Sequence, residues 1–184
     1  LKAPSNQRGR DFEIMLAAFN QLGYSVEWRV INAADYGRAQ RRRRVFFFVF
    51  RNDTKWGKRL HTRYEATLSV DADIKARLDC YAPYIFNDGL FGRQFPVKNE
   101  AVKKRINANK LDEDIAEVSA NFSDGKMWNS GLMTNGYYYT IETEPKGDEE
   151  PIPMKKIVVK ENQVPEDYYI DGEKLEKFKY LRGP

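Results

Sequence analysis

The chain has 184 residues, of which 41% are hydrophobic and 14% aromatic, enough for a packed core, so disorder is excluded as an overall description. Its length corresponds to one domain or at most two small ones. No run approaches the ~18 apolar residues of a membrane helix, and one cysteine and one histidine exclude a disulfide framework, a cysteine-based zinc site and any site that needs two histidines.

Charge is distributed unevenly along the chain. The net charge is +4, but residues 1–63 hold 14 Lys and Arg against 5 Asp and Glu, whereas residues 64–184 hold 17 against 22. A basic first third indicates an anionic partner. Nucleic acid is the leading candidate, because Lys and Arg neutralise its phosphates; the alternative is a basic surface without a partner.

The first predicted elements are a helix and two strands. Residues 10–22 repeat apolar side chains every three or four positions, which predicts an amphipathic helix, and Gly23 stands where helices end. Residues 26–30 alternate apolar and charged side chains, which predicts a strand with one buried face. A polar loop at 33–43 leads to residues 45–50, which are continuously apolar and predict a strand buried on both faces, as in the middle of an α/β sheet.

A strand buried on both faces needs cover on both sides, and the helix at 10–22 supplies only one. We therefore expect residues 1–51 to be the tail of a larger α/β domain, whose other elements cover the second face. Because the chain begins with Leu1 and ends at Pro184, soon after a helix-like stretch, both ends are expected to be cut from a longer protein.

Residues 52–59 form a polar connector and predict a domain boundary. Beyond it we expect a small, irregular α+β unit that is rich in loops. The expected elements are a strand within 60–70, helices at 98–108 and 111–119, a strand at 137–141 after the turn Asn135-Gly136, a strand at 155–160, and a helix at 172–182 that buries Leu175 and Phe178.

Arginines occupy positions 41–44, directly before the apolar strand. A solvated face, a nuclear-import signal and a nonspecific phosphate patch are the simpler interpretations. Because the run abuts a buried strand, however, the sheet holds these side chains in place, and alternate residues of a strand point to the same side. The residues expected on one side are Gln40, Arg42 and Arg44, and those expected on the other are Arg41 and Arg43.

This segment resembles the eighth motif of the cytosine-5 DNA methyltransferases, which is Gln-x-Arg-x-Arg at the start of a strand, preceded by a segment like Asn-Ala-x-Asp-Tyr-Gly-x-Pro. The resemblance covers about residues 8–51, including the helix–strand–loop–strand order. One departure is Ala39, where the family usually has proline. The matching positions are Asn32, Ala33, Asp35, Tyr36, Gly37, Gln40, Arg42 and Arg44.

The resemblance implies that residues 1–51 are the C-terminal part of a Rossmann-like catalytic domain, and that residues 52–184 are a target-recognition domain for double-stranded DNA. The whole chain is then of the α+β class. In that family the target cytosine is flipped out of the stack. Arg44 would contact the flipped cytosine and its backbone, Arg42 would contact phosphate or order the catalytic loop, and Gln40 would orient this region.

Other DNA-contacting candidates are polar or basic residues of the Arg-rich loop and of loops that contain glycine. Arg and Lys pair with guanine, and Asn and Gln with adenine, in the major groove. The simpler interpretation of each is an ordinary surface residue. The candidates are Arg38, Arg41, Arg43, Asn87, Arg93, Gln94, Lys126, Asn129, Thr134 and Asn135.

The family's other motifs do not occur in this sequence. The nucleophile belongs to a Pro-Cys motif, but Cys80 follows Asp79; there is no Glu-Asn-Val, and no glycine-rich loop for the methyl donor S-adenosylmethionine. We therefore expect a fragment of an S-adenosylmethionine-dependent DNA cytosine-5 methyltransferase that is inactive alone and holds neither cofactor nor metal. Its expected setting is a bacterial or phage restriction–modification system, in the cytoplasm at the nucleoid.

Two other functions stay open. One is a stand-alone, non-catalytic DNA-binding module, although the uncovered strand argues against it. The other is the tRNA-methylating branch of the family, which has a shorter insert than the more than 100 residues found after Arg51. We also expect self-association through the exposed sheet face, because large apolar patches seek partners.

Overall fold

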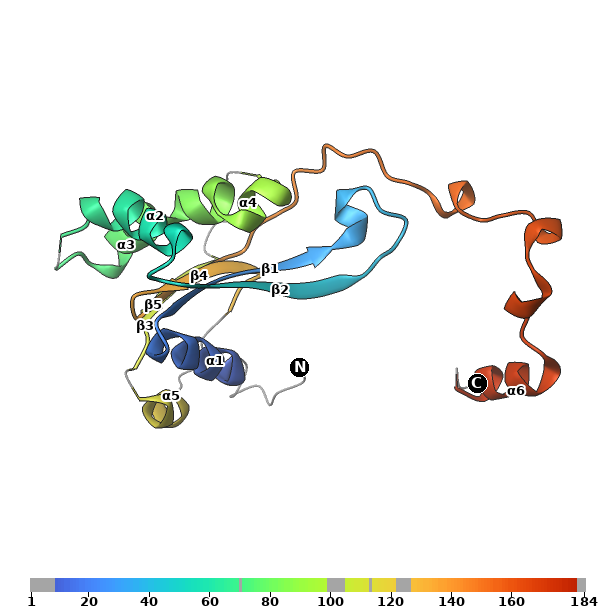
Figure 1. Ribbon diagram of the computed structural model, residues 1–184, viewed down its shortest axis with the longest axis horizontal. Coiled ribbons are helices and arrows are strands. Elements are labelled where there is room, and N and C mark those ends of the chain that lie inside the picture. Colours follow the sequence, from blue (N-terminus) through green and yellow to red (C-terminus); the bar gives the residue numbers. More distant parts are fainter. Residues whose placement is uncertain (1–8, 70, 99–104, 113, 122–126, 182–184) are drawn as a thin grey trace. The chain divides into compact units, whose positions relative to one another are not determined.

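The computed structural model describes residues 9–69, 71–98, 105–112, 114–121 and 127–181. The chain divides into two compact units, Leu1–Pro151 and Ile152–Pro184, which are described separately. In the first unit, helices cover both faces of one antiparallel sheet (Figure 1). The predicted α+β class is confirmed.

The sheet has five strands in the order β2-β1-β4-β5-β3, and all neighbours are antiparallel. The hairpin between β4 and β5 turns at Asn135 and Gly136, whose φ angles of 47° and 75° are both positive, as the favoured two-residue hairpin turn requires. The strands are β1 (Tyr24–Asn32), β2 (Arg43–Arg51), β3 (Ile106–Lys110), β4 (Ser130–Thr134) and β5 (Tyr137–Ile141).

The predicted helix at the start of the chain is confirmed as α1 (Arg10–Gln21). It is followed at Gly23 by a left-handed backbone with φ of 75°, which glycine adopts without steric cost. Its apolar stripe packs on one face of the sheet, where Leu16 and Trp28 are buried in the same cluster. α5 (Ile115–Asn121) lies beside α1 on this face (Figure 1).

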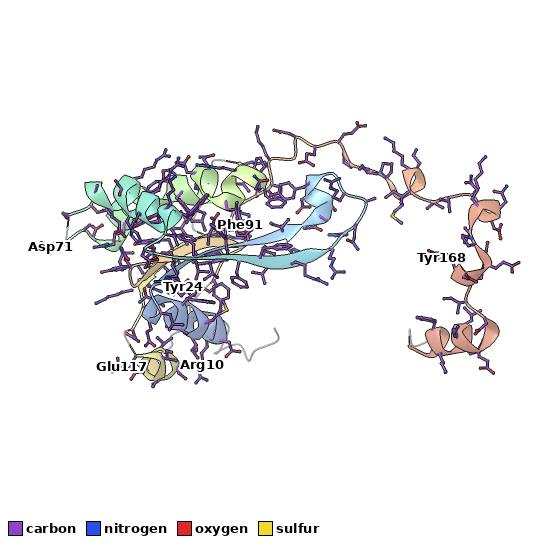
Figure 2. All side chains as sticks on the ribbon, in the orientation of Figure 1. Arg10, Tyr24, Asp71, Phe91, Glu117 and Tyr168 are labelled. Atoms are coloured by element: carbon purple, nitrogen blue, oxygen red, sulfur yellow. The ribbon has the colours of Figure 1, made fainter. Side chains whose placement is uncertain are left out.

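The opposite face of the sheet is covered by α2 (Lys55–Tyr64), α3 (Ile74–Pro83) and α4 (Leu90–Gln94) (Figure 1). The core between these helices and the sheet is rich in tyrosine; the rings of Tyr81 and Tyr139 lie 4.9 Å apart. Figure 2 shows the side chains that fill this layer, including the buried Phe91 of α4.

The burial expected of the two N-terminal strands is wrong, because the strands exchange roles. β1 is buried on both faces, with Glu27 and Arg29 only 1% and 2% exposed, whereas β2 is an edge strand whose Phe46 and Phe47 are 47% and 38% exposed. The charges of β1 suggested a solvent face, but the backbone of α4 satisfies them. The apolar run of β2 indicated burial on both sides, which no described element of the chain provides.

Several predictions after residue 51 are wrong. Residues 60–64 of the expected strand belong instead to α2, whose N-cap Thr54 accepts the Gly57 N–H at 3.3 Å. A 3-10 helix follows at Glu65–Thr67. Residues 106–108 are not helical, because they pair with β5 as part of β3; residues 99–104 of that predicted helix lie outside the described residues.

The second unit also differs from its prediction. Residues 155–160 form no strand, because nothing pairs with them within the described residues; a 3-10 turn at Met154–Lys156 replaces it. The helix expected at 172–182 is confirmed as α6 (Gly172–Leu181). Its Leu175 and Phe178 are exposed, because so short a unit has too few residues to bury them.

Candidate functional site

A hollow of about 480 Å³, here called the arginine pocket, opens where the loop after β1 meets the start of β2 and the end of α4. Gln40, Arg42 and Arg44 line it from alternate positions, as the period of a strand predicts. Its volume suits one small ligand. The lining residues are Ile31, Ala33, Tyr36, Arg38, Gln40, Arg42, Arg44, Phe46, Gln94, Phe95 and Glu149.

The loop that carries the arginines is closed by its own backbone. The 3-10 helix Ala33–Tyr36 is capped by Gly37, where φ is 75° and a Cβ would lie only 3.1 Å from the carboxylate of Glu149. The Ala33 N–H donates to the Arg42 carbonyl at 3.2 Å. This bond places the arginines at the mouth of the pocket before β2 begins.

Two aromatic rings form part of the pocket wall. Tyr36 and Phe95 meet edge to face with centroids 5.1 Å apart, and the Tyr36 hydroxyl donates to the Phe95 carbonyl at 3.5 Å. Burial raises the pKa of Tyr36, so the hydroxyl stays neutral. The pocket therefore combines an apolar wall with cations, which suits a flat ligand that carries negative charge.

Buried charges of β1 hold α4 in place beside the pocket. The Glu27 carboxylate accepts the N–H groups of Leu90 at 2.9 Å and of Phe91 at 2.8 Å, at the start of α4. The Arg29 guanidinium donates to the carbonyls of Phe91 at 3.1 Å and of Phe95 at 2.7 Å.

Burial raises the pKa of Glu27 and lowers that of Arg29, because both charges have left water. The hydrogen bonds to α4 and the opposite charge offset that cost. These bonds fix the end of α4, and with it Gln94 and Phe95 in the wall of the arginine pocket.

Arg42 and Arg44 line the arginine pocket, whereas Arg43 lines a different hollow of about 150 Å³, together with Asn129. Arg41 is exposed, as Arg42, Arg43 and Arg44 are, and it lines neither hollow. The Asn129 side chain bonds both backbone groups of Thr143, at 2.7 and 2.8 Å. Asn129 therefore has a structural role at the end of the β4–β5 hairpin.

Several other predicted residues lie away from the arginine pocket. Thr134 is 1% exposed and hydrogen-bonds the Ser25 hydroxyl at 2.8 Å, so no DNA base can reach it. Asn135 forms the hairpin turn. Arg93 lines a separate hollow beside α2, and Lys126 lies outside the described residues. Of the additional candidates, Arg38 and Gln94 are the ones that share the pocket with the motif residues.

Sequence reasoning missed the residues that complete the site. Phe46 and Phe95 line the pocket, and Glu27 and Arg29 position α4, yet none of them was a predicted site residue. Two opposite charges at alternate positions of an otherwise apolar strand were the available signal for the buried pair. In the described part of the chain, no three potential metal ligands cluster and no helix has the length and apolarity to cross a membrane.

The antiparallel sheet and the helices define an α+β protein, and arginines line one of its pockets. The family of C-5 cytosine-specific DNA methylases matches residues 2–179, so the chain belongs to this family, and the resemblance seen at residues 32–44 is confirmed.

The chain is 44% identical over all 184 residues to the Type II methyltransferase M.Sau3AI of Staphylococcus aureus, and it spans 40% of the length of that protein. It is 41% identical over 49 residues to M.HhaI of Haemophilus parahaemolyticus, which is 27% of this chain and 15% of that protein. M.MthTI of Methanothermobacter thermautotrophicus is 44% identical over 43 residues, 23% of this chain and 13% of that protein. A comparison with solved structures finds no match.

Proposed function

We propose that this chain serves an S-adenosylmethionine-dependent DNA cytosine-5 methyltransferase by holding the target nucleotide and reading the DNA around it. The observation that carries the proposal is the row Gln40, Arg42 and Arg44, which lines one pocket in a chain of the C-5 cytosine-specific DNA methylase family. We propose residues 1–51 as the end of the catalytic domain and residues 52–184 as the target-recognition domain, although β4 of the second segment pairs with β1 of the first.

The pocket offers cations and hydrogen-bond donors that would hold a flipped cytosine and its phosphate. A base must leave the duplex stack before its ring can react, and a guanidinium offers a fixed fork of donors to a carbonyl oxygen or a phosphate. Arg44 would exchange its present bond to the Arg43 carbonyl, 2.8 Å, for the cytosine and its backbone. Arg42 would bind the adjacent phosphate or order the catalytic loop, and Gln40 would orient this region.

The described residues do not fit the methyl donor that the family implies. Nucleotide-type cofactors of α/β domains bind at a glycine-rich turn between a strand and a helix of a parallel sheet, whereas all strand pairs described here are antiparallel. The Cys80 thiol lies in the core layer beside α2, where it donates to the Tyr64 carbonyl at 2.8 Å. We derive no catalytic step from these groups, and we propose that the chain alone transfers no methyl group.

The test of this inactivity is direct. The purified chain is incubated with duplex DNA and S-adenosylmethionine that carries a labelled methyl group, and we expect no label in the DNA. Labelled DNA would show that the donor and nucleophile sites exist in this chain, and it would refute the proposal.

Duplex DNA is the proposed partner, with tRNA as the alternative. Binding to both is measured at matched salt, for the parent chain and for Arg42→Gln/Arg44→Gln. We expect tighter binding to duplex DNA, and weaker binding by the variant. The control is Lys75→Gln/Lys98→Gln, which removes two charges that are already paired with Asp79 and Glu144. Preference for tRNA would favour the tRNA-methylating branch.

The base-reading candidates that stay in the proposal are those at the arginine pocket or next to its arginines in the sequence. Arg38 and Gln94 line the pocket, and Arg41 and Arg43 neighbour Arg42 and Arg44 in the chain, so they would contact nucleotides next to the flipped one. The relatives named Type II methyltransferases support a restriction–modification setting. We accordingly propose bacterial DNA in the cytoplasm as the substrate.

The alternative, a stand-alone DNA-binding module, would also have the arginine pocket. It would not explain why apolar residues of the edge strand β2 are exposed. Val45, Phe46 and Phe47 of the edge strand β2 are 46%, 47% and 38% exposed. We propose that copies of the chain self-associate through the exposed sheet face at these residues of β2. Light scattering at high concentration should show a mass above that of the monomer, and Val45→Lys should lower it; a strictly monomeric parent chain would argue against this surface.

A further inference from the structure

The exposed face of α2 is strongly basic. Lys55, Lys58, Arg59 and Arg63 lie on it, and the helix contains neither Asp nor Glu. The two lysines are in the first turn, where the helix macrodipole disfavours cations by about 0.3–1 kcal/mol each. Cations at positions where they destabilise their own helix indicate a binding partner outside the chain.

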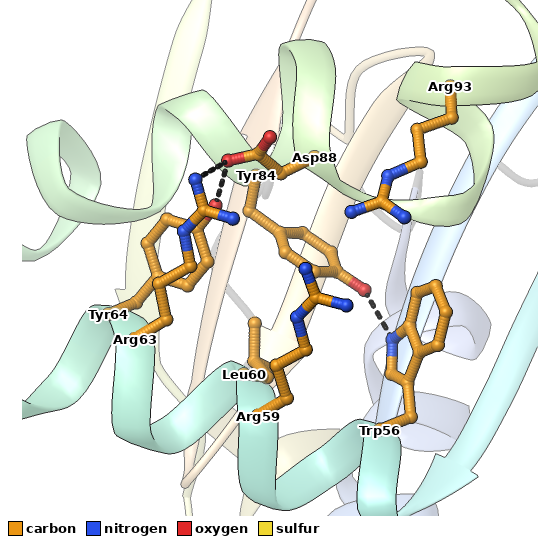
Figure 3. Close-up of a pocket in the computed structure, with 8 residues that line it drawn as sticks. All are labelled: Trp56, Arg59, Leu60, Arg63, Tyr64, Tyr84, Asp88 and Arg93. Carbon is orange, nitrogen blue, oxygen red and sulfur yellow. Dashed lines mark hydrogen bonds and ion pairs between the residues drawn. The ribbon is translucent and has the colours of Figure 1, made fainter.

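Three arginines converge on one hollow beside α2, here called the α2 hollow. Arg59 and Arg63 reach it from α2, and Arg93 reaches it from α4 on the other side (Figure 3). The floor is made by Trp56, Leu60, Tyr64 and Tyr84, and Asp88 is the one acidic residue in the lining.

The carboxylate of Asp88 does not balance these three cations. It lies 2.9 Å from the Arg63 guanidinium and also accepts the Tyr64 hydroxyl. Within the described residues, no carboxylate lies at ion-pair distance from Arg59 or Arg93. The α2 hollow therefore carries two uncompensated positive charges, which repel each other unless an anion lies between them.

The groups around the α2 hollow are held in place. The Trp56 indole N–H donates to the Tyr84 hydroxyl at 3.0 Å, and the Arg93 guanidinium lies 6.0 Å from the centre of the Trp56 ring. A Cβ on Gly57 would lie 2.6 Å from the Arg51 carbonyl oxygen, so α2 begins in close contact with the end of β2. The arginines thus project from a rigid base, as binding sites require.

The volume of the α2 hollow is only about 20 Å³, so a ligand larger than water would lie at its rim. We propose that Arg59 and Arg93 bind a backbone phosphate of duplex DNA at this rim. This inference rests on the proposed function, and it adds a second anchor to the arginine pocket. α4 joins the two sites, because Arg93 lines the α2 hollow and the next residue, Gln94, lines the arginine pocket.

The test measures the salt dependence of binding by the 184-residue chain to a labelled duplex. Each neutralised phosphate adds about 0.9 to the slope of log affinity against log salt. Arg59→Gln/Arg93→Gln should lower the magnitude of that slope by about one. When salt rises from about 50 to about 200 mM, the affinity of the variant should therefore fall by a factor about three to four times smaller than the affinity of the parent chain does. The loss of affinity should be similar for duplexes of different sequence.

Two further variants serve as controls. Arg59→Lys/Arg93→Lys keeps both charges and should keep most of the slope, whereas Lys75→Gln/Lys98→Gln should leave the slope unchanged. If circular dichroism shows that the double glutamine variant is unfolded, Arg59→Gln alone is judged by the same slope, because Arg59 is exposed and makes no ion pair within the described residues.

The possible outcomes separate the two proposals. Suppose that folded Arg59→Gln/Arg93→Gln keeps the salt slope of the parent chain while Arg42→Gln/Arg44→Gln weakens binding. This result would overturn the proposed phosphate site on α2 and would leave the proposed function standing. Absence of duplex binding by the parent chain, or tighter binding to an RNA duplex at matched salt, would overturn both.

Discussion

Arg29→Met removes the buried guanidinium that holds the end of α4 while filling much of its volume with an apolar side chain. Arg29 is 2% exposed and donates to the carbonyls of Ile85, Phe91 and Phe95. Its loss also leaves the carboxylate of Glu27, 1% exposed, without the opposite charge beside it.

The expected cost follows from this arrangement. Glu27 and Arg29 interact as opposite buried charges, and removing one of two compensating buried charges costs about 3–5 kcal/mol, because an uncompensated charge stays behind. A unit of this size loses about 2–4 °C in melting temperature per kcal/mol, so we expect a fall of about 10 °C. The arginine pocket should be disturbed as well, because α4 carries Gln94 and Phe95 into its wall.

Urea unfolding followed by circular dichroism measures the free-energy change. The matched control is Arg51→Met, which removes an ion pair with Asp53 at 2.6 Å whose side chains are 60% and 61% exposed. An exposed pair contributes about 0–1 kcal/mol, so the control should be nearly neutral. If Arg29→Met cost less than about 1 kcal/mol, the buried charges would not hold α4 and this reasoning would be refuted.

Two further predictions concern the other face of the sheet. Gly131→Ala should destabilise by about 3 kcal/mol or more in urea unfolding, because its Cβ would lie 2.1 Å from the Trp28 ring; a neutral result would contradict the close contact. Burial, with a smaller contribution from Asp112, raises the pKa of Glu13 to about 6 from 4.5. The folded chain therefore binds this proton more tightly, and its contribution to stability is full below about pH 4.5 and lost as pH rises through about 6. Glu13→Gln should raise the unfolding free energy by about 1 kcal/mol at about pH 8, after allowing for solvent screening, and leave it unchanged near pH 4; an equal gain at both pH values would contradict the pKa.

The elements that sequence predicted well have strong local signals. The stripe of α1 with its terminal Gly23, and the Asn135-Gly136 hairpin, depend on residues close together in the chain. The shared side of Gln40, Arg42 and Arg44 follows from the period of a strand, which is also local. The family could be recognised from these positions alone.

The wrong predictions depended on contacts between distant residues. The charges of β1 indicated a solvent face because their partners, Leu90 to Phe95, lie some 60 residues away. β3 forms because β5 pairs with it, against a local sequence that suggested a helix. The aromatic wall of the arginine pocket is likewise tertiary, because α4 brings Phe95 to Tyr36.

We propose above all that the arginine pocket holds an unstacked cytosine. The most direct measurement compares the affinity of the chain for a duplex with one unpaired cytosine and for the same duplex fully paired. Because unstacking and unpairing a base costs a few kcal/mol, we predict at least about tenfold tighter binding to the unpaired form, and loss of that preference in Arg42→Gln/Arg44→Gln. Equal affinity for the two duplexes, or a preference that survives in the variant, would contradict the claim.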